Sequence, residues 1–318
     1  MSEPKSLQEA IIYFSNSDNC IAYLSIRRWP NGVVICPGCG SVKVKFSEIR
    51  RTWTCSSHHA KREFSIKVGT VMEDSPISLD KWLTATWLVT NCKNGISSYE
   101  IARDLKITQK SAWFMLHRIR LVMQDDLFGS KLSGEVEADE TFIGGKARNM
   151  HMAQRKRRIT GTGTKDKVAV MGFLERGGKV RTMVVPNRRK HALQGEVKKH
   201  VEAGAALYTD ALQSYSGLDA HYAHEVIDHA VKYVDGRIHT NGLENFWSLL
   251  KRGVSGTYVS VEPFHLFRYL DEQSFRYNNR ELRTDGDRFS RAVSRIVGKR
   301  LTWDKLTGKT PDLETCPN

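Results

Sequence analysis

The chain has 318 residues and a basic excess: 49 Lys and Arg stand against 35 Asp and Glu, giving a formal charge of +14 and an isoelectric point near 9.5. This charge favours a polyanionic partner, and nucleic acid before a membrane surface. No apolar run approaches the roughly 20 residues of a spanning helix and no signal-peptide pattern is present, so we expect a cytoplasmic, nucleoid-associated protein with no membrane partner.

The first two segments predict an N-terminal helical region, residues 1–30, and a small zinc ribbon, residues 31–72. Cys36-Pro-Gly-Cys39 is a C-x2-C knuckle, and Cys55-Ser-Ser-His58 follows after 15 intervening residues. Zinc prefers four tetrahedral N or S ligands. A segment of this size cannot bury enough apolar surface to fold stably without a bound metal or a cross-link. We therefore predict a structural zinc ion held by Cys36, Cys39, Cys55 and His58, with the adjacent His59 as the alternative fourth ligand.

Residues 73–130 predict a helix-turn-helix module that binds DNA. Ser97 and Glu100 have the spacing of a capping box, and Thr108 is a good N-cap for a second helix that runs to about residue 122. Lys110, Arg118 and Arg120 on that second helix are the expected phosphate contacts. The alternative is that these are two helices of an ordinary bundle.

From residue 131 to about 285, strands and helices alternate, which is typical of a mixed α/β sheet flanked by helices. Strands are expected near 135–143, 167–175, 179–186, 205–209 and 224–228, and helices near 190–203, 241–252 and 262–278. The basic stretch from Lys146 to Arg158 is expected to be a mobile loop that offers Arg155 and Arg157 to DNA. Residues 286–318 are expected to form a C-terminal tail.

Three acids in this part of the chain are placed to bind metal. Asp139 lies in a strand-like run, Asp210 ends an apolar stretch, and Glu244 lies seven residues before Lys251 on one side of a predicted helix. Two acids at strand ends and a third on a helix can converge on a pair of divalent ions that clamp a phosphodiester. Asn241 is the rival third ligand, and Lys251 is placed to reach a DNA phosphate. The alternative reading makes Glu244 and Lys251 solvated surface charges.

This order of modules resembles bacterial insertion-sequence transposases of the DDE type, in the ISXO-type group with an N-terminal zinc ribbon and an RNase H-like catalytic domain. The matching stretches cover roughly residues 20 to 290. They are Cys36-Pro-Gly-Cys39-Gly40, Phe64-Ser65 to Gly69-Thr70, Glu135 to Gly145, Tyr208-Thr209-Asp210, and His239 to Gly253. The chain departs from the pattern at His58, which stands where a knuckle cysteine is commoner.

The resemblance implies an RNase H-like domain in which Asp139 and Asp210 bind metal, with Glu244 or Asn241 third and Lys251 following. It further implies Mg²⁺ or Mn²⁺ as the catalytic cofactor and double-stranded DNA, both element ends and target, as the partner of a homo-oligomer. The expected reaction is strand cleavage followed by strand transfer. Two alternatives stay open: a catalytically silent DNA-binding regulator, and a metal-dependent nuclease without strand transfer.

Overall fold

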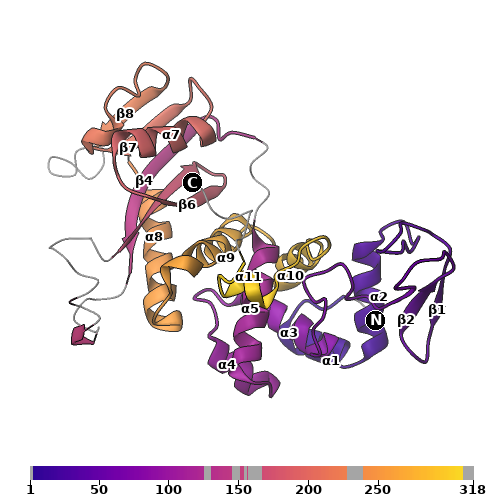
Figure 1. Cartoon of the computed structure of the whole chain (residues 1–318). Helices are drawn as coiled ribbons and strands as arrows, with labels where there is room; N and C mark the ends of the chain where they lie inside the picture. Colours follow the sequence, from indigo (N-terminus) through magenta and orange to yellow (C-terminus); the bar gives the residue numbers. More distant parts are fainter. Residues whose placement is uncertain are drawn as a thin grey trace. The chain divides into compact units, whose positions relative to one another are not determined.

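The computed structural model describes residues 3–124, 130–144, 151–153, 156, 167–227 and 239–310 (Figure 1). The chain divides into two compact units, Met1–Gln124 with Glu281–Asn318, and Asp125–Arg280. The segment that we expected to be a separate tail therefore packs with the N-terminal modules. Within the described ranges, no helix is both long and apolar enough to cross a bilayer.

In the first unit, helices from the N-terminal part of the chain and a helix from its C-terminal part pack in one core. Its helices are α1 (Leu7–Phe14), α2 (Ser17–Arg28), α3 (Leu79–Asn91) and α10 (Asp285–Val293). Phe289 of α10 stacks on Tyr23 at a ring-centroid distance of 5.6 Å and meets Trp87 of α3 at 5.0 Å. The burial of Phe289 among these rings explains why α10 belongs to this unit.

The ribbon is a three-stranded antiparallel sheet in the order β1 (Val44–Ser47), β2 (Thr52–Cys55) and β3 (Glu63–Phe64). Trp53 of β2 stacks on Phe64 with ring centroids 5.9 Å apart, and it also meets Phe46 at 4.7 Å and Trp29 at 5.3 Å. These few aromatic contacts make a small core, so the ribbon depends on a further constraint for its stability.

The helix-turn-helix consists of α4 (Ser98–Leu105) and α5 (Gln109–Met123). The capping box is formed, because the Ser97 side chain accepts from the Glu100 amide while the Glu100 carboxylate accepts from the Ser97 amide. Lys106 ends α4 in the left-handed region, with φ 48°, and the Thr108 side chain caps α5. A short helix, α11 (Trp303–Leu306), packs on α5 through Trp303, whose ring meets Phe114 edge-on at 5.5 Å.

The second unit is built on a five-stranded mixed sheet in the order β6-β5-β4-β7-β8. Its strands are β4 (Glu135–Ile143), β5 (Val168–Glu175), β6 (Val180–Val185), β7 (Ala206–Asp210) and β8 (Ala223–Ile227). Strands β4, β5 and β6 are antiparallel neighbours, whereas β7 runs parallel to β4 and β8 parallel to β7. This confirms the expected α/β class and the RNase H-like mixed sheet.

Helices cover both faces of this sheet. Alternate residues of β4 point to opposite faces: Val136 and Ala138 belong to the core that includes Leu193 and Val197 of α7 (Lys190–His200). On the other face, Ile143 packs in the core formed with α8 (Asn241–Gly253) and α9 (Leu266–Asn278). The buried residues of α8 are Leu243, Phe246, Trp247, Leu250 and Gly253, which lie along one side of the helix.

Candidate functional site

Three cysteines and one histidine of the ribbon form a cluster with the dimensions of a zinc site. The candidate ligand atoms of Cys36, Cys39, Cys55 and His59 all lie within 4.8 Å of one another. Cys36 Sγ is 3.4 Å from His59 Nε2, and Cys39 Sγ is 3.6 Å from Cys55 Sγ. Ligands placed tetrahedrally about 2.3 Å from a zinc ion stand about 3.8 Å apart, so the cluster fits a structural zinc.

The fourth ligand of this cluster is His59, so the sequence-based choice of His58 was wrong. His58 is exposed, whereas the ring of His59 turns toward Cys36 and Gly38. A Cβ atom on Gly38 would lie 3.2 Å from His59 Cε1, so the glycine leaves room for the ring. The second knuckle is thus C-x3-H, because the loop after β2 needs one more residue to bring an imidazole back to the thiolates.

The hydrogen bonds in this cluster favour a thiolate at Cys55. Burial alone raises the pKa of its thiol, but hydrogen bonds involving His59, the Ser57 backbone and Cys39 together outweigh burial and lower the pKa to about 6. Because the thiolate is the form that binds metal, Cys55 is prepared for zinc at neutral pH.

Asp139, in the middle of β4, lies beside Asp210, the last residue of the parallel strand β7. The register pairs Glu137 with Tyr208, so two further steps along each strand bring Asp139 opposite Asp210. Burial, followed by the negative charges of Glu140 and Asp210, raises the pKa of Asp139 to about 7. Such a concentration of carboxylates favours a cation between them.

Helix α8 lies directly over Asp139. Trp247 Nε1 donates a hydrogen bond of 2.9 Å to Asp139 Oδ2, and the Glu140 amide donates one of 2.8 Å to Oδ1. Gly172, the β5 partner of Asp139, makes room for the indole: a Cβ there would lie 2.6 Å from Trp247 Cζ2. The donor role of Trp247 was not predicted from the sequence, because it depends on how α8 packs on the sheet.

The orientation of α8 separates the two rivals for the third position. Phe246 faces α9, where its ring meets Tyr277 at 5.4 Å, and α9 is bonded to β6 through Thr182 and Ser274, 3.0 Å apart. Successive residues of a helix are rotated by about 100° around its axis. Trp247 therefore lies on the edge of the buried side of α8 that is opposite Phe246. Glu244 and Lys251 are rotated about 60° and 40° further than Trp247, away from Phe246. Asn241 lies about 120° beyond Trp247, toward solvent. All three polar residues are exposed.

Two further residues support the acid pair without having been singled out in the sequence. Tyr215 donates a hydrogen bond of 2.7 Å from its hydroxyl to Glu140 Oε2, and Arg188 lies 3.4 Å from Glu140 Oε1. Tyr215 ends the short 3₁₀ helix Gln213–Tyr215, so this bond joins the segment after Asp210 to the residue after Asp139. The sequence offers one sign of this arrangement: Glu140 directly follows Asp139 within a predicted strand.

The structure divides the residues expected to contact DNA into three groups. Lys110 is exposed at the start of α5, with Nζ 4.6 Å from the centroid of the Trp303 ring. Arg118 and Arg120 are only 5% and 1% exposed, so they do not form the phosphate-binding surface expected of them. Arg118 instead donates to the Glu73 carbonyl and lies against Trp82 and Phe114, where burial lowers its pKa to about 10. Arg155 and Arg157 lie outside the described residues.

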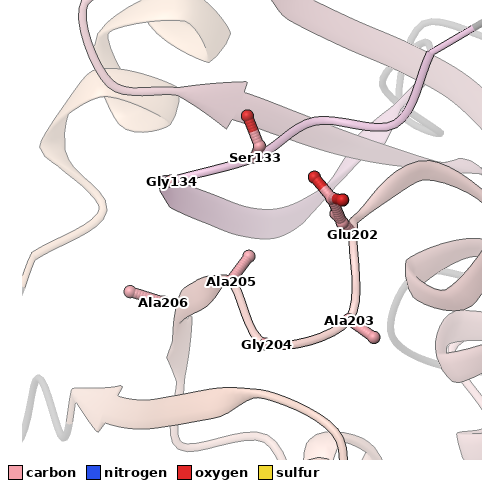
Figure 2. A pocket seen from close by; sticks show the side chains of 7 residues that line it. All are labelled: Ser133, Gly134, Glu202, Ala203, Gly204, Ala205 and Ala206. Carbon is pink, nitrogen blue, oxygen red and sulfur yellow. The ribbon is translucent and has the colours of Figure 1, made fainter.

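A shallow hollow lies at the other end of the same two strands. It is lined by Ser133, Gly134 and the segment 202–206, at the amino ends of β4 and β7 (Figure 2). Because Asp139 and Asp210 each lie four residues after the first residue of their strand, this hollow is not part of the acid site. Its lining carries one acidic side chain, Glu202, and otherwise small residues.

Comparison with known proteins identifies both units. An ISXO2-like transposase domain matches residues 131–278, and a transposase zinc-ribbon domain matches residues 15–59. A protein from transposable element ISH50 of Halobacterium salinarum is 28% identical over 242 residues, covering 72% of this chain and 80% of the relative. A transposase-like protein of Haemophilus influenzae is 32% identical over 107 residues, covering 33% of this chain and 86% of the relative.

The first match spans the α/β unit with its paired acids, and the second spans most of the ribbon with its cysteines. The fold, the order of the modules and the two relatives therefore agree with the resemblance seen in the sequence. The chain belongs to the ISXO2-like insertion-sequence transposases that carry an N-terminal zinc ribbon.

Proposed function

We propose that this transposase cleaves the ends of its mobile element and joins them to target DNA with a carboxylate site made of Asp139, Asp210 and Glu244. The site would hold divalent metal ions, Mg²⁺ or Mn²⁺, because hard oxygen donors suit these cations. The observation that carries the proposal is that Asp139 of β4 and Asp210 at the end of β7 lie side by side, with α8 over Asp139.

The electrostatics of the site support a bound cation. Asp139 is buried and its negative neighbours are Glu140 and Asp210, which together with burial raise its pKa to about 7. A divalent cation would offset this repulsion and favour the ionised carboxylates. The residues present therefore fit a metal site in both charge and donor type.

Glu244 is the better candidate for the third ligand. It lies on the flank of α8 that continues from Trp247, whose indole already touches Asp139, and away from the flank that faces α9. Lys251 shares this flank two turns further on, in position to meet a phosphate of the DNA. Asn241 points about 60° further from the sheet than Glu244, which places its amide farther from the strand ends.

Divalent ions held by these carboxylates would stabilise the charge that develops on the phosphodiester during cleavage and would make water a stronger nucleophile. The protein residues supply the geometry. Trp247 and the Glu140 amide each occupy one oxygen of Asp139 and so fix the plane of its carboxylate. Lys251 would neutralise charge on the DNA backbone close to the scissile bond, and the freed 3′-hydroxyl would then attack target DNA.

The first unit would bring the element ends to this site. The exposed start of α5, with Lys110, is the proposed reading surface for double-stranded DNA, and the zinc ribbon is the proposed accessory contact. Because transposition joins two element ends to one target, we expect the protein to act as a homo-oligomer on DNA in the nucleoid.

The test is a Mg²⁺-dependent assay on duplexes that carry the DNA flanking the gene. Wild-type protein should nick the element end and join a pre-cut end to plasmid, and Glu244→Gln should abolish both reactions while leaving DNA binding intact. Asn241→Ala should retain most of the activity. If Glu244→Gln cleaves normally and Asn241→Ala is inactive, the third metal ligand is Asn241. If the wild-type protein nicks DNA but does not join a pre-cut end to plasmid, it is a nuclease.

A further inference from the structure

A second acid of β4, Glu137, is buried on the same face as Asp139. Its side chain is 1% exposed. Because side chains alternate between the two faces of a strand, Glu137 lies on the same face as Asp139, two residues before it and beneath α8. A carboxylate rarely reaches this degree of burial unless its oxygens are paired. Its partners therefore indicate what it does.

Glu137 binds the first turn of α8 from outside the helix. Its Oε2 accepts a hydrogen bond of 3.0 Å from the backbone amide of Leu243. The first amides of a helix have no partner within it and are commonly satisfied by the residue that precedes the helix. Thr240, at that position, makes no side-chain cap bond within the described part of the chain, so a residue of the sheet supplies the acceptor.

Gly242 makes this close approach possible. A Cβ atom at that position would lie 2.8 Å from Glu137 Oε2 and 2.4 Å from Leu174 Cδ2. Any larger residue would push the first turn of α8 away from both β4 and β5. The sequence Asn241-Gly242-Leu243 thus combines a glycine at the contact with the amide that Glu137 binds.

The Arg176 guanidinium, on the segment after β5, lies against the buried carboxylate of Glu137. Arg176 donates from Nε to Glu137 Oε1 at 3.1 Å and from Nη2 to the carbonyl of His239 at 2.7 Å. His239 Nδ1 lies 3.3 Å from the same Glu137 oxygen, and the Arg176 guanidinium rests over the Tyr208 ring at 4.0 Å. One arginine therefore joins β4, β7 and the residues that lead into α8.

We infer that Glu137 is a positioning residue that sets the placement of α8, and with it Glu244, relative to Asp139 on the same strand. The inference rests on the proposed function, because it gives Glu244 and Asp139 a common metal. Glu137 fixes Leu243, the residue just before Glu244, while Trp247 fixes the next turn on Asp139 itself. Two bonds from one strand thus hold the helix at the spacing that the metal site needs.

The test uses the full-length protein and Mn²⁺ as the metal probe. Glu137→Ala and Gly242→Ala should each weaken Mn²⁺ binding by about tenfold or more, as the loss of a supporting contact outside the ligands does. Glu137→Gln should retain much of the affinity, because its amide oxygen can still accept from Leu243. Hydrogen exchange of residues 241–244 should accelerate in both of the weakened variants.

Two matched controls separate positioning from general damage. Glu196→Ala removes a carboxylate of α7 that lies 2.7 Å from Lys199 Nζ and 3.4 Å from His200 Nε2, and Gly195→Ala adds a Cβ to a glycine of the same helix that has nothing within 4 Å. Both should bind Mn²⁺ as the wild type does.

Unchanged Mn²⁺ affinity or unchanged exchange at 241–244 in Glu137→Ala and Gly242→Ala would overturn the inference. Failure of the proposed function gives a different pattern: wild type and Asp139→Asn would then bind Mn²⁺ equally. In that case the exchange measurement alone decides whether Glu137 holds α8.

Discussion

The ribbon and the α/β unit each contain a candidate metal site, but the residues of the two sites differ greatly in how far apart they lie in the sequence. The ribbon draws its four ligands from residues 36–59, on knuckles and a loop beside a three-stranded sheet. The α/β unit brings Asp139 and Asp210 together through the parallel register of two strands and adds α8 from a third part of the sequence.

This difference predicts opposite relations between metal and fold. The ribbon has a core of a few aromatic rings, so the metal contributes to its folding. The sheet of the α/β unit has an extensive apolar core on each face, so its acids are held in place before a metal arrives. Removing metal should therefore unfold the first site and only silence the second.

The largest expected effect is on the chemistry of the second site. Asp139→Asn should lower Mg²⁺-dependent nicking by roughly a thousandfold, since metal clamping contributes several kcal/mol to the transition state. The sheet should stay folded, because the amide can still accept from Trp247. Circular dichroism and zinc content are the controls, and both should match the wild type. Nicking at the wild-type rate would remove Asp139 from the catalytic set.

The next effect separates two neighbouring histidines in the ribbon. His59→Ala removes a ligand and should reduce zinc affinity by more than the roughly 10–100-fold that an outer-shell partner costs. His58→Ala changes the neighbouring side chain, which is exposed, so this variant should bind zinc as the wild type does. Competition with a chromophoric chelator measures both affinities. Equal zinc loss in the two variants would contradict the C-x3-H knuckle.

The two sites should also respond differently to pH. The pKa of Asp139 is raised to about 7, so below that pH the metal-free carboxyl is protonated and must lose its proton to bind metal. The affinity for Mn²⁺ should therefore fall as pH drops below 7, by up to about tenfold per unit. The pKa of Cys55 is lowered to about 6, so the ribbon should keep zinc at pH values where Mn²⁺ binding has weakened. Mn²⁺ titrations between pH 5.5 and 8 test this, and a flat profile would contradict it.

The smallest expected effect concerns the basic residues of α5. Lys110→Ala should weaken DNA binding and reduce the slope of log affinity against log salt by roughly one, as the loss of one phosphate contact does. Arg118→Ala should leave that slope unchanged and instead lower the melting temperature, because the residue is buried against Trp82. A salt slope that changes with Arg118 and not with Lys110 would reverse this assignment.

The sequence predicted what depends on local pattern. Alternation and apolar spacing predicted the strands and α8, and Ser97, Glu100 and Thr108 predicted both helix starts of the helix-turn-helix. It failed where a side chain's direction depends on distant packing. His58 and His59 differ only in how one loop turns, and Arg118 has the same spacing whether it faces DNA or Trp82.

The same limit applies to the acid site. Acid type and strand position drew attention to Asp139, within one predicted strand, and to Asp210, at the end of another, and the structure brings the two into neighbouring strands. The roles of Trp247, Glu137 and Tyr215 are not visible in the sequence, because each depends on which element lies across from it. A donor to a carboxylate is defined by register and helix placement, and these are set by the whole sheet.

The most direct test of the central claim is a crystal structure with Mn²⁺ and its anomalous difference map. We expect a peak with carboxylate oxygens of both Asp139 and Asp210 at about 2.0–2.6 Å, and Glu244 on the same side of α8 as this peak. The zinc signal should lie separately, among Cys36, Cys39, Cys55 and His59. A Mn²⁺ peak elsewhere, or none at Asp139 and Asp210 in a fully folded sheet, would contradict a metal-dependent carboxylate site formed by β4 and β7.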